Sequence, residues 1–383
     1  MPPQPPAPLR IAITCYPSVG GSGILASALG LHLAARGHEI HFISYERPVR
    51  LPPPPQLPPR IHFHPVDVND YQLFKYPDYT LPLSVTMAQV AQEHHLDILH
   101  VHYAVPHATA ALLARGILNG HPKPRIITTL HGTDTTLLAR DPAYAPAIRY
   151  ALRASDALTA VSHFLAHETH DALNVDRPID VIHNFFAPTP PARPRDLVRQ
   201  DLGLADHQPL LVHLSNLRPI KRIDILLAAA ALLPRDIPWK LLILAGDSFA
   251  PFLPEVRRLN LTDRLLIRER VPFVEEFLNA ADLALFASDS ESFCLSILEA
   301  MCFALPSVAT KVGGIPEVTL HNQTALLVPP HDPAALAAAA TELLRDPARR
   351  AALGQAAQQR AAQFSPEVIV PHYESLYHRV LST

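Results

Sequence analysis

The sequence predicts an α/β protein made of two doubly wound, Rossmann-like domains that face each other across a cleft. Short runs of β-branched and aliphatic residues alternate with Ala- and Leu-rich segments of helical length. This alternation is typical of right-handed βαβ crossovers around a parallel sheet. It is interrupted once, by a Pro- and Arg-rich segment at residues 187–209. We therefore expect a linker there, with one domain on each side of it.

The strand-like runs form two series, and the segments between them carry apolar residues at helical spacing. The first series comprises residues 10–14, 40–44, 61–65, 98–101, 126–130 and 158–160. The second comprises residues 210–214, 241–245, 265–267, 283–286, 307–309 and 325–328. The predicted domains are residues 1–186 and 187–365, and a last helix at 366–383 is expected to pack back on the first domain.

Composition excludes several classes of protein. Hydrophobic residues make up 48% of the 383 residues, which is enough to bury large cores and argues against wholesale disorder. The net charge of −3 is spread without long single-sign runs, so we expect no nucleic-acid partner. No apolar stretch reaches the length of a membrane span and no secretory signal is evident, so we expect a cytoplasmic protein without membrane contact.

Three scattered cysteines, Cys15, Cys294 and Cys302, predict neither a disulfide framework nor a zinc site. The sequence leaves the oligomeric state open, and a homo-oligomer is compatible with it.

Two motifs of the first domain follow predicted strands. The first is the glycine-rich run from Ser18 to Gly23, which opens a predicted helix. Consecutive glycines at a helix start suit either a phosphate cradle or a plain tight turn. The second is His131 in the run Thr-Leu-His-Gly-Thr-Asp. Its position beyond a strand favours a ligand contact, although a lone histidine is more often a structural hydrogen-bonding residue.

A basic motif opens the second domain. Arg218, Lys221 and Arg222 lie at a strand-to-helix junction, where the helix dipole disfavours cations. An anion between them would remove that conflict, and a guanidinium with an ammonium suits a diphosphate. The alternative is a solvated basic face.

An acidic motif follows a later strand. Glu291 and Glu299 are eight residues apart, the first in a loop and the second in the next helix. A loop carboxylate can accept hydrogen bonds from sugar hydroxyls, and one on the helix can reach a ribose diol. The spacing alone is common by chance. It becomes informative because Gly313-Gly-Ile-Pro-Glu317 follows one strand later.

The ordered set of GGSG, HGTD, SNLRPIKR, ESFCLSILEAM and GGIPE resembles the retaining glycosyltransferases of family four, which have the two-domain GT-B fold. A second set is more specific: ITCYPSVGGSG, GHEIHFIS, FKYPDY, HVHYAVPHA and TTLHGTD. It resembles the subgroup that transfers N-acetylglucosamine from UDP-N-acetylglucosamine to L-malate, the first step of bacillithiol biosynthesis. The similarity extends from about residue 10 to residue 377.

This resemblance implies an acceptor-binding first domain and a nucleotide-sugar-binding second domain. It implies roles in catalysis for Arg218 and Lys221 at the leaving diphosphate, for Glu291 beside the donor sugar and for His131 near its 6-hydroxyl. The implied donor-binding residues are Gly21, Asn216, Phe293, Cys294, Leu295 and Glu299, of which Glu299 binds the ribose. The implied acceptor-binding residues are Ser22, Tyr103, Thr129 and Asn184. No metal and no cofactor are expected, since UDP-N-acetylglucosamine is a substrate.

One residue departs from the family pattern. Cys294 follows Ser-Phe where the family usually has glycine. A backbone φ below zero would tolerate a cysteine there, whereas a positive φ would be strained.

Three other functions stay open at this level. One is a family-four transferase with another acceptor, and another is a GT-B-fold UDP-sugar 2-epimerase. The third, a non-catalytic two-domain sugar-binding protein, is disfavoured because it needs no Arg218–Lys221 pair and would usually carry an export signal.

Overall fold

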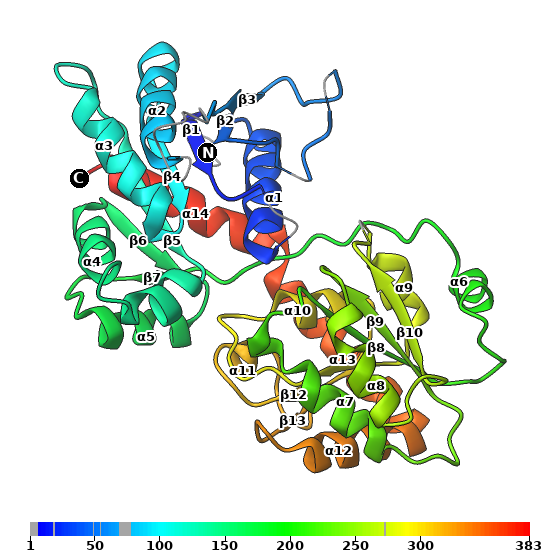
Figure 1. Cartoon of the computed structure of the whole chain (residues 1–383). Helices are drawn as coiled ribbons and strands as arrows, with labels where there is room; N and C mark the ends of the chain where they lie inside the picture. The colour runs from blue at the N-terminus through cyan, green and yellow to red at the C-terminus, as the bar shows by residue number, and fades with distance from the viewer. Residues whose placement is uncertain (1–6, 18–19, 49, 54, 69–77, 272) are drawn as a thin grey trace. The chain divides into compact units, whose positions relative to one another are not determined.

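The computed structural model describes residues 7–17, 20–48, 50–53, 55–68, 78–271 and 273–383. The chain divides into two compact units, each described here by itself. The first comprises residues 1–184 and 366–383, and the second comprises residues 185–365. Both are doubly wound parallel α/β units, so the predicted fold class is confirmed (Figure 1).

The sheet of the first unit has seven strands in the order β3-β2-β1-β4-β5-β6-β7, and all pairs are parallel. The strands are β1 (Arg10–Thr14), β2 (Glu39–Ser44), β3 (Ile61–Pro65), β4 (Ile98–His102), β5 (Arg125–Leu130), β6 (Ala157–Ala160) and β7 (Asp180–Val181). Six of them were predicted, with ends shifted by one residue at most. The seventh, β7, was missed because two residues are too short to show a period.

Helices pack on both faces of this sheet. They are α1 (Gly21–Ala35), α2 (Thr80–His94), α3 (Thr109–Ile117), α4 (Ala145–Ala154), α5 (His163–Leu173) and α14 (Pro366–Leu381). The last of these comes from the C-terminus of the chain. Tyr377 on α14 is fully buried, and its hydroxyl is 2.8 Å from Nδ1 of His100 on β4. Glu374 accepts hydrogen bonds of 2.7 Å from both ends of the Arg36 guanidinium fork, which anchors the same helix beyond α1.

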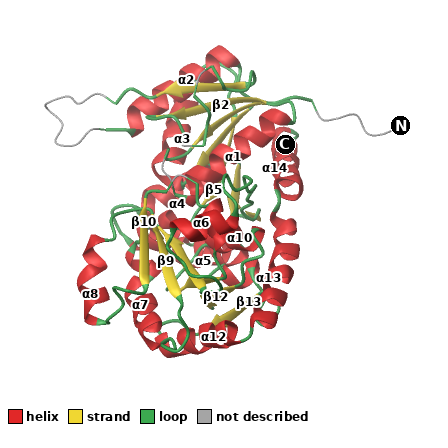
Figure 2. Ribbon diagram, turned by 90° about the vertical axis from the view of Figure 1, so that its right-hand side faces the viewer, coloured by secondary structure: helices red, strands yellow, loops and turns green. Residues whose placement is uncertain are grey.

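The sheet of the second unit has six parallel strands in the order β10-β9-β8-β11-β12-β13. They are β8 (Leu210–Ser215), β9 (Lys240–Ala245), β10 (Leu265–Glu269), β11 (Leu283–Phe286), β12 (Ser307–Thr310) and β13 (Ala325–Val328). The helices are α6 (Arg195–Asp201), α7 (Ile223–Leu232), α8 (Leu253–Arg258), α9 (Glu275–Ala280), α10 (Leu295–Cys302), α11 (Ile315–Val318), α12 (Pro333–Arg345) and α13 (Pro347–Ala361). Figure 2 shows the strands of each unit as a layer flanked by helices. In the described part of the chain, no helix is both long enough and apolar enough to cross a membrane.

The strand order places a topological switch point in each unit. Successive strands are added on one side of β1 and then, from β4 on, on its other side. In the second unit the same reversal occurs between β8 and β11. In open α/β sheets, ligands bind beyond the carboxyl ends of the strands at such a point. The loops after β1, β4, β8 and β11 are therefore the positions at which the fold predicts binding sites.

At the opposite, amino ends of the strands, aspartates fix the register. Asp97, Asp156 and Asp282 each directly precede a strand. The carboxylate of each accepts the backbone N–H of the neighbouring strand at 2.7–2.8 Å. The backbone N–H of the same aspartate donates to the carbonyl of the same neighbour. Each aspartate thus closes a two-bond ring with the next strand.

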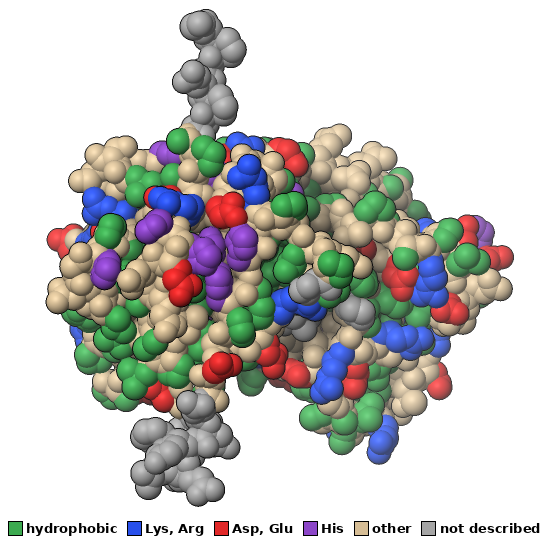
Figure 3. Space-filling model, turned by 90° about the horizontal axis from the view of Figure 1, so that it is seen from above, with side chains coloured by type: hydrophobic (Ala, Val, Ile, Leu, Met, Phe, Trp, Pro, Cys, Tyr) green, Lys and Arg blue, Asp and Glu red, His purple; other side chains and the backbone are tan. Residues whose placement is uncertain are grey.

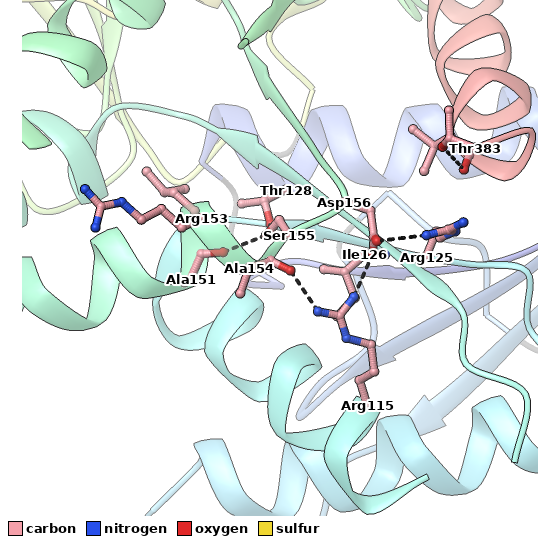
Figure 4. Close-up of polar contacts among 12 residues, drawn as sticks. Arg115, Arg125, Ile126, Thr128, Ala151, Arg153, Ala154, Ser155, Asp156 and Thr383 are labelled. Atoms are coloured by element: carbon pink, nitrogen blue, oxygen red, sulfur yellow. Dashed lines mark hydrogen bonds and ion pairs between the residues drawn. The ribbon is translucent and has the colours of Figure 1, made fainter. Parts of the chain in front are cut away.

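Figure 4 shows this arrangement at Asp156. Its Oδ2 accepts from the backbone N–H of Ile126 at 2.7 Å and from Arg115 at 2.8 Å, and Arg125 is 3.3 Å from Oδ1. The neighbouring Ser155 hydroxyl donates to the carbonyl of Ala151 at 2.8 Å. These charged residues stabilise the amino ends of the strands, which are remote from the predicted binding loops at the carboxyl ends.

We predict that Asp156→Ala destabilises the first unit by roughly 1–3 kcal/mol, because it leaves the Ile126 N–H and the guanidinium groups without their acceptor. Asp156→Asn should cost less, since an amide oxygen can still accept from Ile126. Denaturant unfolding measures both effects. Asp176→Ala, at an exposed position, is the control, and an equal loss in all three variants would contradict the interpretation.

Candidate active site

In the second unit, a buried ion pair joins two loops at the carboxyl ends of β8 and β11. Nζ of Lys221 donates to Oε1 of Glu291 at 2.5 Å, and the Ser288 hydroxyl donates to the same oxygen at 2.7 Å. Burial favours the neutral form of the Lys221 ammonium, but the charge of nearby groups, Glu291 foremost, and the hydrogen bond to Glu291 together outweigh burial, so the pKa of Lys221 is raised. Lys221 is therefore a cation held at the switch point.

Two glycines allow the Glu291 loop to take this position. A Cβ on Gly313, which has a φ of +54°, would lie 2.0 Å from the carbonyl oxygen of Glu291. A Cβ on Gly314 would lie 2.4 Å from that of Ser292. The Gly314 N–H donates to the Glu291 carbonyl at 2.8 Å. The GGIPE motif therefore acts as a close-packed backbone support for the acidic loop.

A histidine with no assigned role shapes the basic loop. Nδ1 of His213 donates to the carbonyl of Leu285 at 2.8 Å, so Nε2 accepts from the Ser215 hydroxyl at 2.8 Å. The Ser215 oxygen in turn accepts the backbone N–H of Leu217 at 3.2 Å. Burial lowers the pKa of His213 to about 4, so the ring stays neutral. His213 lies two residues before the SNLRPIKR motif. Sequence reasoning gave it no role, because a single buried histidine gives no signal of its hydrogen-bond partner.

The three cations of the basic motif have different surroundings. Arg222 is held by carboxylates, with Asp224 at 2.8 Å and Asp289 at 3.0 Å. The conflict with the helix dipole is therefore resolved for Arg222 by protein carboxylates rather than by a bound anion. Arg218 is exposed, and its guanidinium forms no ion pair with any residue that the structure describes. Asn216 lies at the same turn, with its Oδ1 3.4 Å from the backbone nitrogen of Arg218.

Helix α10 carries the remaining predicted donor residues. Phe293 and Cys294 are buried immediately before the helix, Leu295 is its first residue, and Glu299 is buried within it. Cys294 has a φ of +73°, in the left-handed region that favours glycine. Of the two backbone conformations considered for this cysteine, the chain adopts the strained one, with a positive φ. Burial is the main cause that raises the pKa of the Cys294 thiol, and repulsion from Glu291 is the second. The thiol is therefore uncharged.

In the first unit, the loops after β1 and β4 meet through two hydroxyls. The Tyr103 hydroxyl donates to Oγ of Ser22 at 2.7 Å. Ser22 lies in the first turn of α1, next to the exposed Gly21, and among the described residues no side chain caps the start of this helix at Gly20. The backbone amides of the first turn are thus oriented as they would be for an anion.

The other two predicted acceptor residues lie in different surroundings. Thr129 is completely buried, and its Oγ1 is hydrogen-bonded to Nε2 of His100 at 2.7 Å and to Oγ1 of Thr159 at 2.6 Å. Its hydroxyl is therefore engaged within the core, and the residue reaches the β4 loop through its carbonyl, which accepts the Tyr103 N–H at 2.9 Å. Asn184 is buried at the end of the first unit, three residues after β7.

His131 belongs to a group of neutral histidines at the carboxyl ends of β4 and β5. Its Nε2 is 2.8 Å from Nδ1 of His102, and Nδ1 of His107 donates to the His102 carbonyl at 2.5 Å. Burial lowers the pKa of His131 to about 3. At neutral pH, His131 can therefore donate or accept a hydrogen bond but carries no charge.

Asp134 is a residue of this region that sequence reasoning missed. It is fully buried, and its Oδ2 accepts the backbone N–H of Ala104 at 2.8 Å. This bond holds the turn in which Tyr103 has a φ of +82°. Burial raises the pKa of Asp134 to about 6. The aspartate of the HGTD motif was visible in the sequence, but its partner is a backbone group that leaves no sequence signal.

Comparison with known proteins places the chain among glycosyltransferases. Residues 19–190 match the model of Glycosyltransferase Family 4, and residues 194–360 match that of glycosyl transferases group 1. The chain is 42% identical to the N-acetyl-alpha-D-glucosaminyl L-malate synthase of Bacillus anthracis, over 97% of each chain. It is 29% identical to the D-inositol 3-phosphate glycosyltransferase of Kineococcus radiotolerans, over 90% of this chain and 87% of that one.

The fold has solved counterparts as well. Sucrose-phosphate synthase from Thermosynechococcus elongatus superimposes with a TM-score of 0.78 at 21% identity, over 98% of this chain and 99% of that one. The two Rossmann-like units are those of the GT-B fold. With 97% of its length matched at 42% identity, the chain belongs to the same glycosyltransferase family as the N-acetyl-alpha-D-glucosaminyl L-malate synthase of B. anthracis.

Proposed function

We propose that the protein transfers N-acetylglucosamine from UDP-N-acetylglucosamine to the hydroxyl of L-malate, with retention at the anomeric carbon, as the first step of bacillithiol biosynthesis. The observation that carries this proposal is the 42% identity to the N-acetyl-alpha-D-glucosaminyl L-malate synthase of B. anthracis over 97% of both chains. The D-inositol 3-phosphate glycosyltransferase of K. radiotolerans is less similar to this chain, at 29% identity.

The second unit supplies the donor site in this proposal. Arg218 and Lys221 bind the diphosphate, Glu299 binds the ribose, and Asn216 and the amides of Phe293 to Leu295 complete the site. Glu291, which holds Lys221 at 2.5 Å, contacts the donor sugar. Negative charge grows on UDP as it departs, so cations aimed at the diphosphate stabilise the transition state more than the ground state.

The first unit supplies the acceptor site. Malate has two carboxylates, and the uncapped amides at Gly21 and Ser22, with the Ser22 hydroxyl that Tyr103 orients by its hydrogen bond, are donors suited to one of them. Thr129 supports Tyr103 from the core, and Asn184 adds an amide to the same unit. His131, neutral because its pKa is lowered by burial, hydrogen-bonds the 6-hydroxyl of the sugar.

The reaction step needs no protein nucleophile. The bond between the anomeric carbon and the UDP oxygen breaks, and the malate hydroxyl oxygen forms a new bond on the same face. The hydroxyl proton passes to an oxygen of the departing diphosphate. Arg218 and Lys221 stabilise the charge that remains, so the proposed step requires no metal ion.

The proposal is tested by measuring UDP release from UDP-N-acetylglucosamine with malate, lactate or inositol 3-phosphate, and with no acceptor. We expect release that depends on malate, with lactate used at least about tenfold less well, because a missing carboxylate leaves its hydrogen-bond donors unpaired. UDP release without any acceptor would favour the epimerase, and preference for inositol 3-phosphate would favour another acceptor class.

We predict that Lys221→Ala and Arg218→Ala each lower kcat by roughly 10²–10³, since each removes one charge-stabilising donor. Arg257→Ala, an exposed arginine on α8 of the same unit, is the matched control and should leave kcat unchanged. Circular dichroism checks that the variants are folded. Near-wild-type turnover in both Lys221→Ala and Arg218→Ala would place the diphosphate elsewhere.

We predict that Tyr103→Phe raises KM for malate about tenfold and leaves KM for the UDP-sugar nearly unchanged, because one hydroxyl on the acceptor side is lost. Tyr150→Phe is the matched control, since this tyrosine on α4 is 65% exposed. Steady-state kinetics with each substrate varied separately gives both constants. A defect confined to the UDP-sugar would reject Tyr103 as an acceptor residue.

A further inference from the structure

A cluster of histidines in the first unit has no part in the proposed reaction. His41 lies on β2, His62 and His64 lie on β3, and His94 is the last residue of α2. Figure 3 shows histidine side chains gathered next to one another on the surface, with carboxylates beside them. The scattered cysteines indicate no metal site, and these histidines give no local sequence signal because they are distributed over 54 positions of the chain, from 41 to 94.

The parallel sheet brings the histidines together. His41 pairs with His62 across β2 and β3, and Ile43 pairs with His64. Residues two apart on a strand point to the same face, so His62 and His64 both flank His41 on one side of the sheet. Helix α2 ends over this face with His94, whose ring centroid is 4.4 Å from that of His41 and 5.3 Å from that of His64.

The distances match those of a metal site. Nδ1 of His41 is 3.0 Å from Nε2 of His64. His41, His64 and His94 each offer one nitrogen within 4.8 Å of those of the other two. Around a tetrahedral zinc ion with Zn–N distances of about 2.0–2.1 Å, ligand nitrogens are roughly 3.4 Å apart. Binding therefore requires only small adjustments of the half-buried His64 and His94 side chains from the spacings of 3.0 Å and at most 4.8 Å that they have here.

The surroundings of the cluster also suit a cation. Glu39 accepts a hydrogen bond from His62, which stacks on His41, so a carboxylate lies just outside the three ligands. Nε2 of His41 is buried without a hydrogen-bond partner among the described residues.

We propose that His41, His64 and His94 bind one divalent transition-metal ion with the ligand preferences of Zn²⁺, in which the three imidazoles leave a fourth position for water. The ion joins β2, β3 and the end of α2, and its role is to stabilise the first unit rather than to take part in glycosyl transfer. A hydrogen-bonded histidine cluster without affinity for metal is the alternative.

The test measures Zn²⁺ binding to the untagged full chain after removal of metal with a chelator. Titration calorimetry should give one Zn²⁺ per chain, and Co²⁺ should give the visible absorption of a tetrahedral site. His64→Gln and His94→Gln, which are only partly buried, should each weaken Zn²⁺ binding at least about tenfold. The buried His41 is left intact, so the variants are expected to fold. His121→Gln, an exposed histidine of the same unit, is the matched control and should bind like the unmodified chain.

Thermal unfolding gives a second readout. Excess Zn²⁺ should raise the Tm of the unmodified chain and of His121→Gln, because the ion binds the folded state preferentially. It should not raise the Tm of the double variant His64→Gln/His94→Gln. The double variant should keep its transferase activity, since the cluster lies outside the proposed donor and acceptor sites. No Zn²⁺ binding by the unmodified chain, or undiminished binding by the double variant, would overturn the proposal.

Discussion

The buried ion pair of Lys221 and Glu291 is the interaction on which the second unit's binding loops depend. Bringing two charges out of water is costly, and such a pair is stable only when further hydrogen bonds compensate. Here the Ser288 hydroxyl supplies one, at 2.7 Å from the same carboxylate oxygen. The close approach of Gly313 and Gly314 to the backbone of Glu291 and Ser292 then fixes where that carboxylate lies. Lys221 is thus held in place by the protein itself, as the proposed diphosphate site requires.

The first unit positions its loops with the buried Asp134 at the Tyr103 turn and otherwise with neutral groups. Tyr103 bonds Ser22, His131 bonds His102, and a chain of hydrogen bonds runs from Thr129 through His100 to Tyr377 on the C-terminal helix. Burial keeps these rings neutral, because it lowers the pKa of His100 to about 3 as well as that of His131. In the proposed reaction, a dianionic acceptor would meet dipoles and hydroxyls there, and the cations of the second unit would face the leaving group. This division of charge between the units agrees with the proposed reaction.

The sequence was enough to predict most strands and the binding motifs. It was not enough to predict hydrogen bonds and ion pairs whose partner is distant in the chain or is a backbone group. Strands such as β1 and β8 were predicted because continuous aliphatic runs are typical of buried parallel strands. The binding of Arg222 to Asp289 could not be foreseen, since these residues lie 67 positions apart and only the β8–β11 pairing brings them together. Asp134 was missed because it binds the Ala104 N–H, and the sequence did not indicate that the Thr129 hydroxyl bonds His100 and Thr159 in the core. The histidines of β2, β3 and α2 were missed because only sheet register makes them neighbours.

Cys294 shows how a fold tolerates a residue that its backbone disfavours. A left-handed conformation costs a side chain other than glycine roughly 1–2 kcal/mol, and such strain persists where the surroundings over-determine the backbone. The turn is fixed on one side by Gly314, because a Cβ there would lie 3.1 Å from Cα of Phe293, and on the other by the start of α10. The buried thiol recovers part of the cost by removing apolar surface from water. Glycine at this position would relax the backbone but would leave the space of the thiol empty, so the two residues differ less in net stability than the φ of +73° alone implies.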